Sequence, residues 1–368
     1  MKLTLGPRMR PSRRLLRHSG LSPQHSRESG NPGAGITEWQ GLRGAGTCAA
    51  LALLLGLMLA VPAQLSAAAL RVVTTVAPIT SIVENVAGDR AQVAGIVPEG
   101  VNSHTFRPAP SVARTMARAD LIILNGLNLE IPTLKLARAN KRPDTPVLLL
   151  GDHTVAEQDY LFDFSFPEDQ GHPNPHLWPD PVHVMNYARL VRDALIEKDP
   201  GGRAVYEANT ERYLKQLEAL DKATAAAVAT VPPRNRRLLT YHDSWPYFAK
   251  RYGFRVIGAV QPSSFAEPSP REVARLIDQL KREQLPAVFG SEVFPSPVLR
   301  QIAREAGTTF VDNLRDDDLP GEAGDPDHSY TGMMLANLRT IVTALGGSAD
   351  ALKAVDPAPV AGHHARYR

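Results

Sequence analysis

Four side chains of metal-binding type lie at near-even intervals along this chain: His104, His176, His242 and Asp312. Three imidazoles and one carboxylate can form a closed tetrahedral zinc shell, whereas a catalytic zinc keeps one position open for water. Neutral imidazoles also suit zinc better than they suit manganese, which favours oxygen ligands. The set therefore predicts a site that holds a divalent metal rather than one that does chemistry with it.

Three of these four residues follow short apolar runs that are typical of buried strands. The runs are Val93–Val97 before His104, Arg237–Tyr241 before His242 and Thr308–Val311 before Asp312. In open α/β sheets, ligands bind just beyond the carboxyl ends of the strands. We therefore expect the four side chains to meet at one cleft. Since binding needs deprotonated imidazoles, the metal affinity should fall as the pH drops through the histidine range.

The basic character of the whole chain comes from its first part. The 368 residues have a net charge of +3, but residues 1–68 hold eight Lys and Arg against two Glu. The remaining chain is therefore slightly acidic, and its charge gives no reason to expect a nucleic-acid partner.

Residues 1–68 are interpreted as an N-terminal extension followed by a signal peptide. Ala49–Val61 is an apolar run too short for a confident membrane span, preceded by Arg-rich sequence and followed by small residues that suit cleavage between Ala67 and Leu70. The only cysteine, Cys48, precedes this run, whereas a lipoprotein cysteine would follow it. The expectation is a periplasmic protein with a cleavable signal peptide that is not a lipoprotein.

From residue 69 onward, strand-like and helix-like segments alternate, which predicts an α/β fold with parallel sheets. A long helix over Arg203–Val228 separates two such halves. We therefore expect two lobes, each a mostly parallel sheet flanked by helices, joined by one linking helix. The predicted division is an N-terminal lobe over 69–202, a linking helix over 203–230, a C-terminal lobe over 231–348 and a flexible tail over 349–368.

Several motifs together resemble the zinc and manganese substrate-binding proteins of bacterial metal ABC transporters, the cluster A-I family. They run in order through residues 70–346, and the agreement of five motifs is far more specific than any one of them. The motifs are Pro98–Ser111 (PEGVNSHTFRPAPS), Leu124–Glu130 (LNGLNLE), Asn174–Pro181 (NPHLWPDP), His242–Gly253 (HDSWPYFAKRYG), and Asp312 followed by Ser329-Tyr330 and Met333–Asn337.

The resemblance implies a C-clamp protein that captures a metal between two lobes and delivers it to an inner-membrane ABC permease. It implies that His104, His176, His242 and Asp312 are the ligands. It also implies that the protein is a monomer and that it is not an enzyme. Manganese-selective relatives generally have Glu where this chain has His242, so Zn²⁺ is the expected metal. Mn²⁺ and iron remain alternatives, as does a metal chaperone or adhesin on the same fold.

Other residues have two interpretations each. Glu292 follows a predicted strand and is an alternative ligand or an outer-shell residue, and it would be the general base if the protein were instead a zinc hydrolase. Asp180 either orients an imidazole or simply begins a helix before Pro181. His153 and His172 lie in or beside the polar loop 151–174 and either assist metal capture or are solvated. Asp316, Asp317 and Asp318 form a run that is usually a solvated turn.

Overall fold

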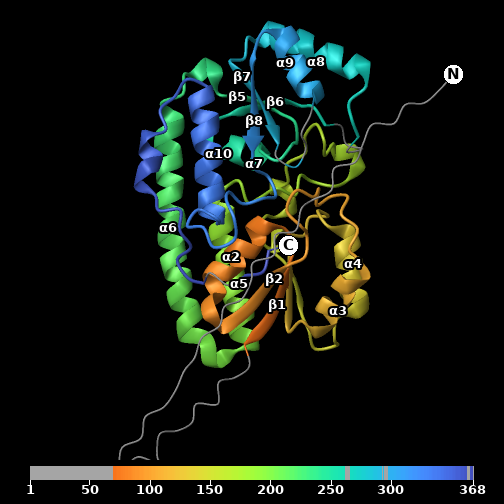
Figure 1. Ribbon diagram of the computed structural model, residues 1–368, viewed down its shortest axis with the longest axis vertical. Helices are drawn as coiled ribbons and strands as arrows, with labels where there is room; N and C mark the ends of the chain where they lie inside the picture. Colours follow the sequence, from red (N-terminus) through yellow and green to blue (C-terminus); the bar gives the residue numbers. More distant parts are fainter. Residues whose placement is uncertain (1–68, 262–265, 292, 294–296, 363–364, 368) are drawn as a thin grey trace, which may run out of the picture. The chain divides into compact units, whose positions relative to one another are not determined.

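The computed structural model describes residues 69–261, 266–291, 293, 297–362 and 365–367. The predicted extension and signal peptide, with Cys48, lie outside the described residues, and so does Glu292. Figure 1 shows the arrangement of the described elements, which form two sheets with a long helix beside both.

The N-terminal lobe is built on a four-stranded parallel sheet in the order β2-β1-β3-β4. Helices α2, α5 and α6 contact one another, while α3 contacts α4 and β1. The strands are β1 (Leu70–Thr74), β2 (Ala91–Gly95), β3 (Leu121–Leu124) and β4 (Val147–Leu149). The helices are α2 (Ala77–Ala87), α3 (Pro110–Arg118), α4 (Ile131–Asn140) and α5 (Pro181–Lys198).

The C-terminal lobe repeats this arrangement with the parallel order β6-β5-β7-β8. Helix α9 contacts β7, β8 and α8, and α10 contacts β8. The strands are β5 (Arg237–Thr240), β6 (Arg255–Ala259), β7 (Ala287–Ser291) and β8 (Thr309–Leu314). The helices are α7 (Pro246–Tyr252), α8 (Pro270–Glu283), α9 (Pro297–Ala306) and α10 (Tyr330–Ala344).

Helix α6 (Arg203–Ala229) links the two lobes, as the sequence predicts. Its 27 residues span roughly 40 Å at 1.5 Å per residue. It buries one side through Tyr206, Tyr213, Leu217 and Leu220, and it contacts α2 and α5 of the N-terminal lobe as well as α10. One hydrophobic core therefore runs from the first sheet along α6 and α10 into the second lobe. This shared core favours a rigid connection between the lobes.

The end of the chain is bound, unlike the flexible tail expected over 349–368. Gln216 on α6 donates to the carbonyl oxygens of Asp356 and Ala358 at 2.8 Å. Further on, Arg366 pairs with β2, since its amide donates to Val93 O at 2.9 Å and Gly95 N donates to its carbonyl at 2.9 Å. Tyr367 adds a hydrogen bond from its hydroxyl to Glu84 on α2. These contacts return the chain end to the N-terminal lobe.

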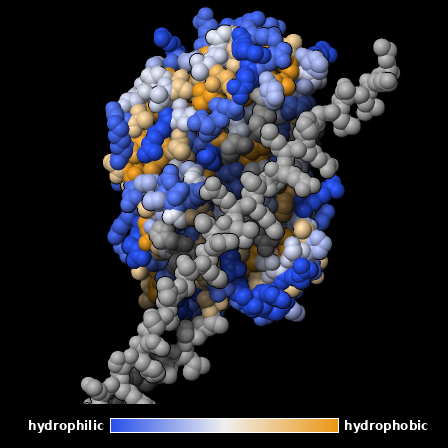
Figure 2. Space-filling view, in the orientation of Figure 1, coloured by the Kyte–Doolittle hydropathy of each residue, from blue (hydrophilic) through white to orange (hydrophobic). Residues whose placement is uncertain are grey.

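Figure 2 shows hydrophilic and apolar residues interspersed over the visible face of the molecule. Among the residues that the structure describes, no helix combines the length and the apolar character needed to span a bilayer.

Candidate metal centre

The side chains of His104, His176 and His242 meet at one point between the two sheets. Nε2 of His176 lies 3.2 Å from Nε2 of His104 and 3.0 Å from Nε2 of His242. Within the described part of the chain, these three residues form the group of His, Cys, Asp and Glu side chains whose ligand atoms all lie close enough to hold one ion. Residues separated by more than sixty positions in the sequence are thus brought together.

The spacing of the three nitrogens fits a tetrahedral metal ion. Zinc binds histidine nitrogen at about 2.0–2.1 Å, so two nitrogens of a tetrahedral shell lie roughly 3.3–3.4 Å apart. The two Nε2 separations are within a few tenths of an ångström of that value. A small movement of the imidazoles would therefore place three nitrogens of a tetrahedral shell around one ion.

Both ligand loops of the N-terminal lobe use the same local turn, an Asn two residues before the His. Oδ1 of Asn102 accepts from the backbone N–H of His104 at 2.9 Å, and Oδ1 of Asn174 accepts from that of His176 at 3.0 Å. Asn favours such turns because its short side chain can hydrogen-bond to the backbone two residues on. This repeated Asn-x-His pattern was readable in the sequence and was missed there.

Amide oxygens fix the orientation of two imidazoles. Oδ1 of Asn174 lies 2.7 Å from Nδ1 of His176, and Oε1 of Gln261 lies 2.8 Å from Nδ1 of His242. An amide oxygen only accepts, so each Nδ1 carries the proton and each Nε2 presents its lone pair to the centre. Two lone pairs that face each other at 3.0 Å repel unless a cation lies between them. This arrangement therefore favours a bound metal.

Two of the histidines, His104 and His176, are held in the neutral form that a metal requires. Burial lowers the pKa of His104 and of His176 well below the usual value of 6.5, and charge on the neighbouring His242 lowers both further. Phe166 packs its ring against both imidazoles, at centroid distances of 5.5 and 5.7 Å. Trp178 covers His176 at 4.9 Å. These aromatic rings restrict water at the centre, which strengthens electrostatic attraction to a cation.

The loop that contains Phe166 also connects the two lobes. Ser165 donates its amide to Oδ2 of Asp243 at 3.1 Å and its hydroxyl to the carbonyl of Gln261 at 2.7 Å. Nδ2 of Asn174 donates to the carbonyl of Asp243 at 2.6 Å. The polar loop 151–174 is thus part of the structure around the centre, which its irregular composition did not reveal.

Asp312 does not lie with the three histidines, contrary to the prediction that all four side chains meet at one cleft. Strand β8 runs on to Leu314, so Asp312 lies within the strand rather than after it. Its Oδ2 forms an ion pair at 3.1 Å with Arg300 on α9, and its side chain is one third exposed. The apolar run Thr308–Val311 marked only the first part of the strand, so the predicted strand end was too early.

The acidic run after β8 replaces Asp312 beside the centre, and it is buried rather than a solvated turn. Oδ1 of Asp316 accepts from the hydroxyl of Ser244, two residues beyond His242. Asp317 accepts from the amide of Ser103 at 3.4 Å. Burial raises the pKa of Asp316, and it raises that of Asp317 to about 6, while charge on His242 lowers both. Two carboxylates thus flank the histidines.

The remaining predicted residues have other surroundings. Asp180 caps α5, since its Oδ1 accepts from the amide of Val182 at 2.9 Å, and it pairs with Arg251 at 3.4 Å. The helix-start interpretation of Asp180 is therefore supported, and Asn174 occupies the orienting position next to His176. His153 is exposed in a short 3-10 turn. His172 lines a cavity of about 170 Å³ together with His104, and its Nδ1 accepts from Asn128 at 2.9 Å.

Comparison with known proteins identifies the family. The sequence profile described as "Zinc-uptake complex component A periplasmic" matches residues 72–344. The chain belongs to this family. The matched residues include most of both sheets and all of helix α6.

Relatives in this family are named for different metals. The manganese-binding lipoprotein MntA of Halalkalibacterium halodurans is 30% identical over 75% of this chain and 88% of its own length. The iron-binding protein YfeA of Yersinia pestis is 29% identical over 75% of this chain and 86% of its own. The structure of the periplasmic zinc binding protein TroA from Treponema pallidum gives a TM-score of 0.69 at 26% identity, covering 75% of this chain and 99% of that one.

These comparisons overturn one prediction. The position of Cys48 led to the expectation that the protein is not a lipoprotein. MntA is named a lipoprotein, and so are the streptococcal relatives SsaB of Streptococcus sanguinis and PsaA of Streptococcus pneumoniae. The expectation is therefore wrong: it rested on the position of Cys48 alone, whereas these relatives are named lipoproteins.

Proposed function

We propose that this protein binds one divalent metal ion as transported cargo through His104, His176 and His242. The observation that supports the proposal is the meeting of three Nε2 atoms, two of them turned inward by amide acceptors. A site preformed in this way loses little free energy on ordering its ligands when the metal arrives. Membership of the family supports the same function.

We propose zinc as the preferred metal. Three imidazole nitrogens favour zinc over manganese, and manganese sites take more oxygen donors. Manganese and iron are the alternatives, since relatives are named for both. A competition titration of the metal-free protein separates them. We expect zinc to displace manganese at equal concentrations, and a preference for manganese would reassign the cargo.

Asp316 is the proposed fourth ligand. It follows the carboxyl end of β8, it is 4% exposed, and it contacts the segment that carries His242 through Ser244. A carboxylate there would complete a three-nitrogen, one-oxygen shell of the closed zinc type. Asp317, which contacts the His104 segment through Ser103, would then remain as an acceptor beside the shell.

The proposed role of the bound ion is import by an ABC permease, as the family suggests. We propose that 69–202 and 231–348 act as the two lobes, that 203–230 keeps them in register, and that the monomer docks on the permease. A strain lacking the protein should grow poorly at low zinc and recover with added zinc. Wild-type protein should restore growth, whereas a variant lacking all three histidines should not.

Native mass spectrometry with metal analysis tests binding against catalysis. The proposal expects one tightly held zinc per chain. A zinc hydrolase is the alternative, in which the three histidines leave a position for water and Glu292 acts as base. Esterase or peptidase turnover by the zinc-loaded protein that is lost in Glu292→Gln would favour the hydrolase, and its absence would favour transport.

A further inference from the structure

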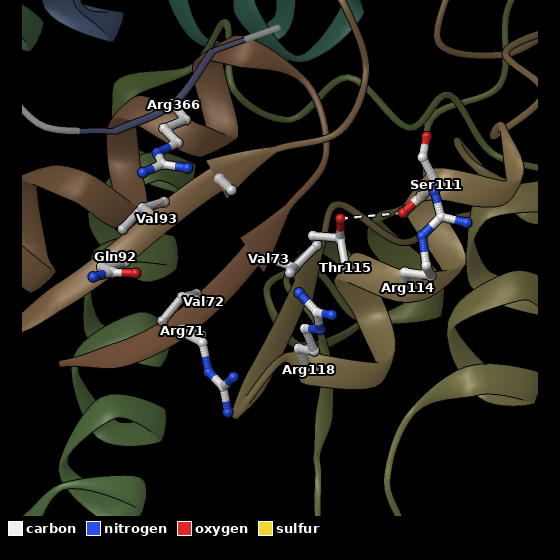
Figure 3. A pocket seen from close by; sticks show the side chains of 11 residues that line it. Arg71, Val72, Val73, Gln92, Val93, Ser111, Arg114, Thr115, Arg118 and Arg366 are labelled. Atoms are coloured by element: carbon white, nitrogen blue, oxygen red, sulfur yellow. Dashed lines mark hydrogen bonds between the residues drawn. The ribbon is translucent and has the colours of Figure 1, made fainter. Parts of the chain in front are cut away.

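A second cavity, of about 300 Å³, lies on the N-terminal lobe between α3 and the strands β1 and β2. It is lined by the second to fourth residues of both five-residue strands, whereas the histidines follow the carboxyl ends of strands. Figure 3 shows that residues of helix α3 line one side, and residues of the two strands with the chain end line the other. The cavity is therefore separate from the metal centre.

Four arginines from separate parts of the sequence line this cavity. Figure 2 shows hydrophilic residues over the α3 and α4 side of this lobe. The four are Arg71 on β1, Arg114 and Arg118 on α3, and Arg366 in the segment that pairs with β2. All four are exposed to solvent. The bound chain end thus contributes one of the four positive charges.

Most of this positive charge is not neutralised by neighbouring groups. Asp120 accepts from the Nε of Arg71 at 3.3 Å and from Arg142 at 2.8 Å. These contacts lower the pKa of Asp120 to about 2, against the opposing effect of its partial burial. Arg114, Arg118 and Arg366 form no ion pair with any residue that the structure describes, so three guanidinium groups remain available to a ligand.

The rest of the lining combines an apolar floor with hydroxyl and amide groups. Val72, Val73 and Val93 lie at the floor of the cavity and are almost fully buried in the fold. Thr115 uses its hydroxyl to donate to Ser111 O at 3.3 Å, within the first turns of α3. Small-molecule sites are typically 300–1,000 Å³, mostly apolar, with a few polar groups that fix orientation. This cavity falls at the lower limit of that range.

We propose that this cavity binds a phosphate group carried on a small apolar moiety. A guanidinium presents a planar fork of donors that matches two phosphate oxygens, and such charge-assisted pairs are stronger than neutral hydrogen bonds. Arg114, Arg118 and Arg366 bind the phosphate oxygens, and the apolar moiety occupies the space between α3 and the two strands. The phosphate belongs either to a soluble phosphate monoester or to a phospholipid headgroup, which share this chemistry.

The experiment compares the full-length zinc-loaded protein with two double variants of equal charge. Arg114→Gln/Arg118→Gln removes two charges from the cavity. Arg282→Gln/Arg304→Gln removes two exposed charges from α8 and α9 of the other lobe. Phenyl phosphate is titrated by calorimetry, and flotation with phosphatidylglycerol or phosphatidylcholine vesicles tests the lipid source. Zinc content of each variant, measured in parallel, reports that the fold and the metal centre are intact.

We expect the wild-type protein to bind phenyl phosphate saturably, or to float with phosphatidylglycerol vesicles but not with phosphatidylcholine vesicles. The cavity variant should weaken the observed binding about 10-fold or more, with the control variant unchanged. Calorimetric binding identifies a soluble phosphate monoester, and flotation alone identifies a lipid headgroup. The proposal is overturned if wild type binds neither probe, or if both variants lose binding equally, since that would reflect net charge alone.

Discussion

The two lobes share one strand order, yet they position the side chains proposed to bind the metal in different ways. In the C-terminal lobe, His242 and Asp316 each lie two residues past a strand, after Thr240 and Leu314. In the N-terminal lobe, His104 lies well beyond β2 and His176 far beyond β4. The C-terminal lobe thus uses strand ends to place these groups, and the N-terminal lobe uses loops.

Loops need additional contacts to hold a ligand in place, and both N-terminal loops have an Asn two residues before the His. The contact of Asn174 with Nδ1 of His176 makes that loop the more constrained of the two. The parallel sheets therefore provide the location of the site, whereas side-chain hydrogen bonds in the loops provide its geometry.

Removing a histidine at a strand end should have the largest effect. We expect His242→Ala to weaken zinc binding by more than about 100-fold, because loss of a ligand exceeds the 10–100-fold typical of outer-shell changes. A competition titration with a chelating dye measures the loss. His153→Ala is the matched control, since His153 is exposed in a surface turn. Unchanged affinity in His242→Ala would remove His242 from the site.

The two candidate carboxylates give a sharper test of strand-end placement. We expect Asp316→Asn to weaken zinc binding roughly 100-fold, since it removes the negative charge that completes the shell. Asp312→Asn should leave zinc affinity unchanged, because Asp312 lies within β8 and pairs with Arg300 on α9. The same titration compares them. The reverse order of effects would return Asp312 to the shell and contradict the corrected strand end.

The two Asn residues test the loop half of the comparison. Asn174→Ala should weaken zinc binding about 10–100-fold, because it frees both the backbone and the imidazole of His176. Asn102→Ala loses a backbone contact to His104 and should have a smaller effect. Calorimetric zinc titration of both variants measures the difference. Equal effects would show that the imidazole contact of Asn174 adds nothing.

The smallest expected effect is on how the stability of the metal-free protein depends on pH. The lowered pKa values of His104 and His176 mean that both stay neutral in the folded state at pH 6.5. They take up protons on unfolding below about pH 6.5, so the free energy of unfolding contributed by them falls as the pH drops below that value. Nitrogen NMR of the imidazoles should show neutral rings. Titration of both rings with an ordinary pKa near 6.5 would contradict burial as the cause.

Much of the fold could be predicted from the sequence. The apolar runs before His104, His242 and Asp312 overlap β2, β5 and β8, and α6 nearly coincides with the predicted Arg203–Val228 helix. Helix α4 buries only Thr133 and Ala137, so it has little apolar periodicity by which a sequence pattern could reveal it. The bound chain end was missed as well, since its contacts with β2 and α2 run through backbone groups and polar side chains.

The site was only partly predictable. The three histidines were found because residue type and motif both indicated them, and the structure places them together. Asp312 was placed incorrectly because β8 extends past its apolar run through Asn313 and Leu314. Gln261 and Phe166 could not be found by pattern, because their contacts with the histidines depend on how two distant loops pack.

The most direct test of the central claim is X-ray absorption at the zinc K-edge of the zinc-loaded protein. We expect one zinc with three imidazole nitrogens at about 2.0–2.1 Å and one oxygen ligand at a similar distance. The multiple scattering of imidazole rings counts the histidines directly. Two or fewer imidazoles, or an unchanged count in His242→Ala, would contradict a centre formed by His104, His176 and His242.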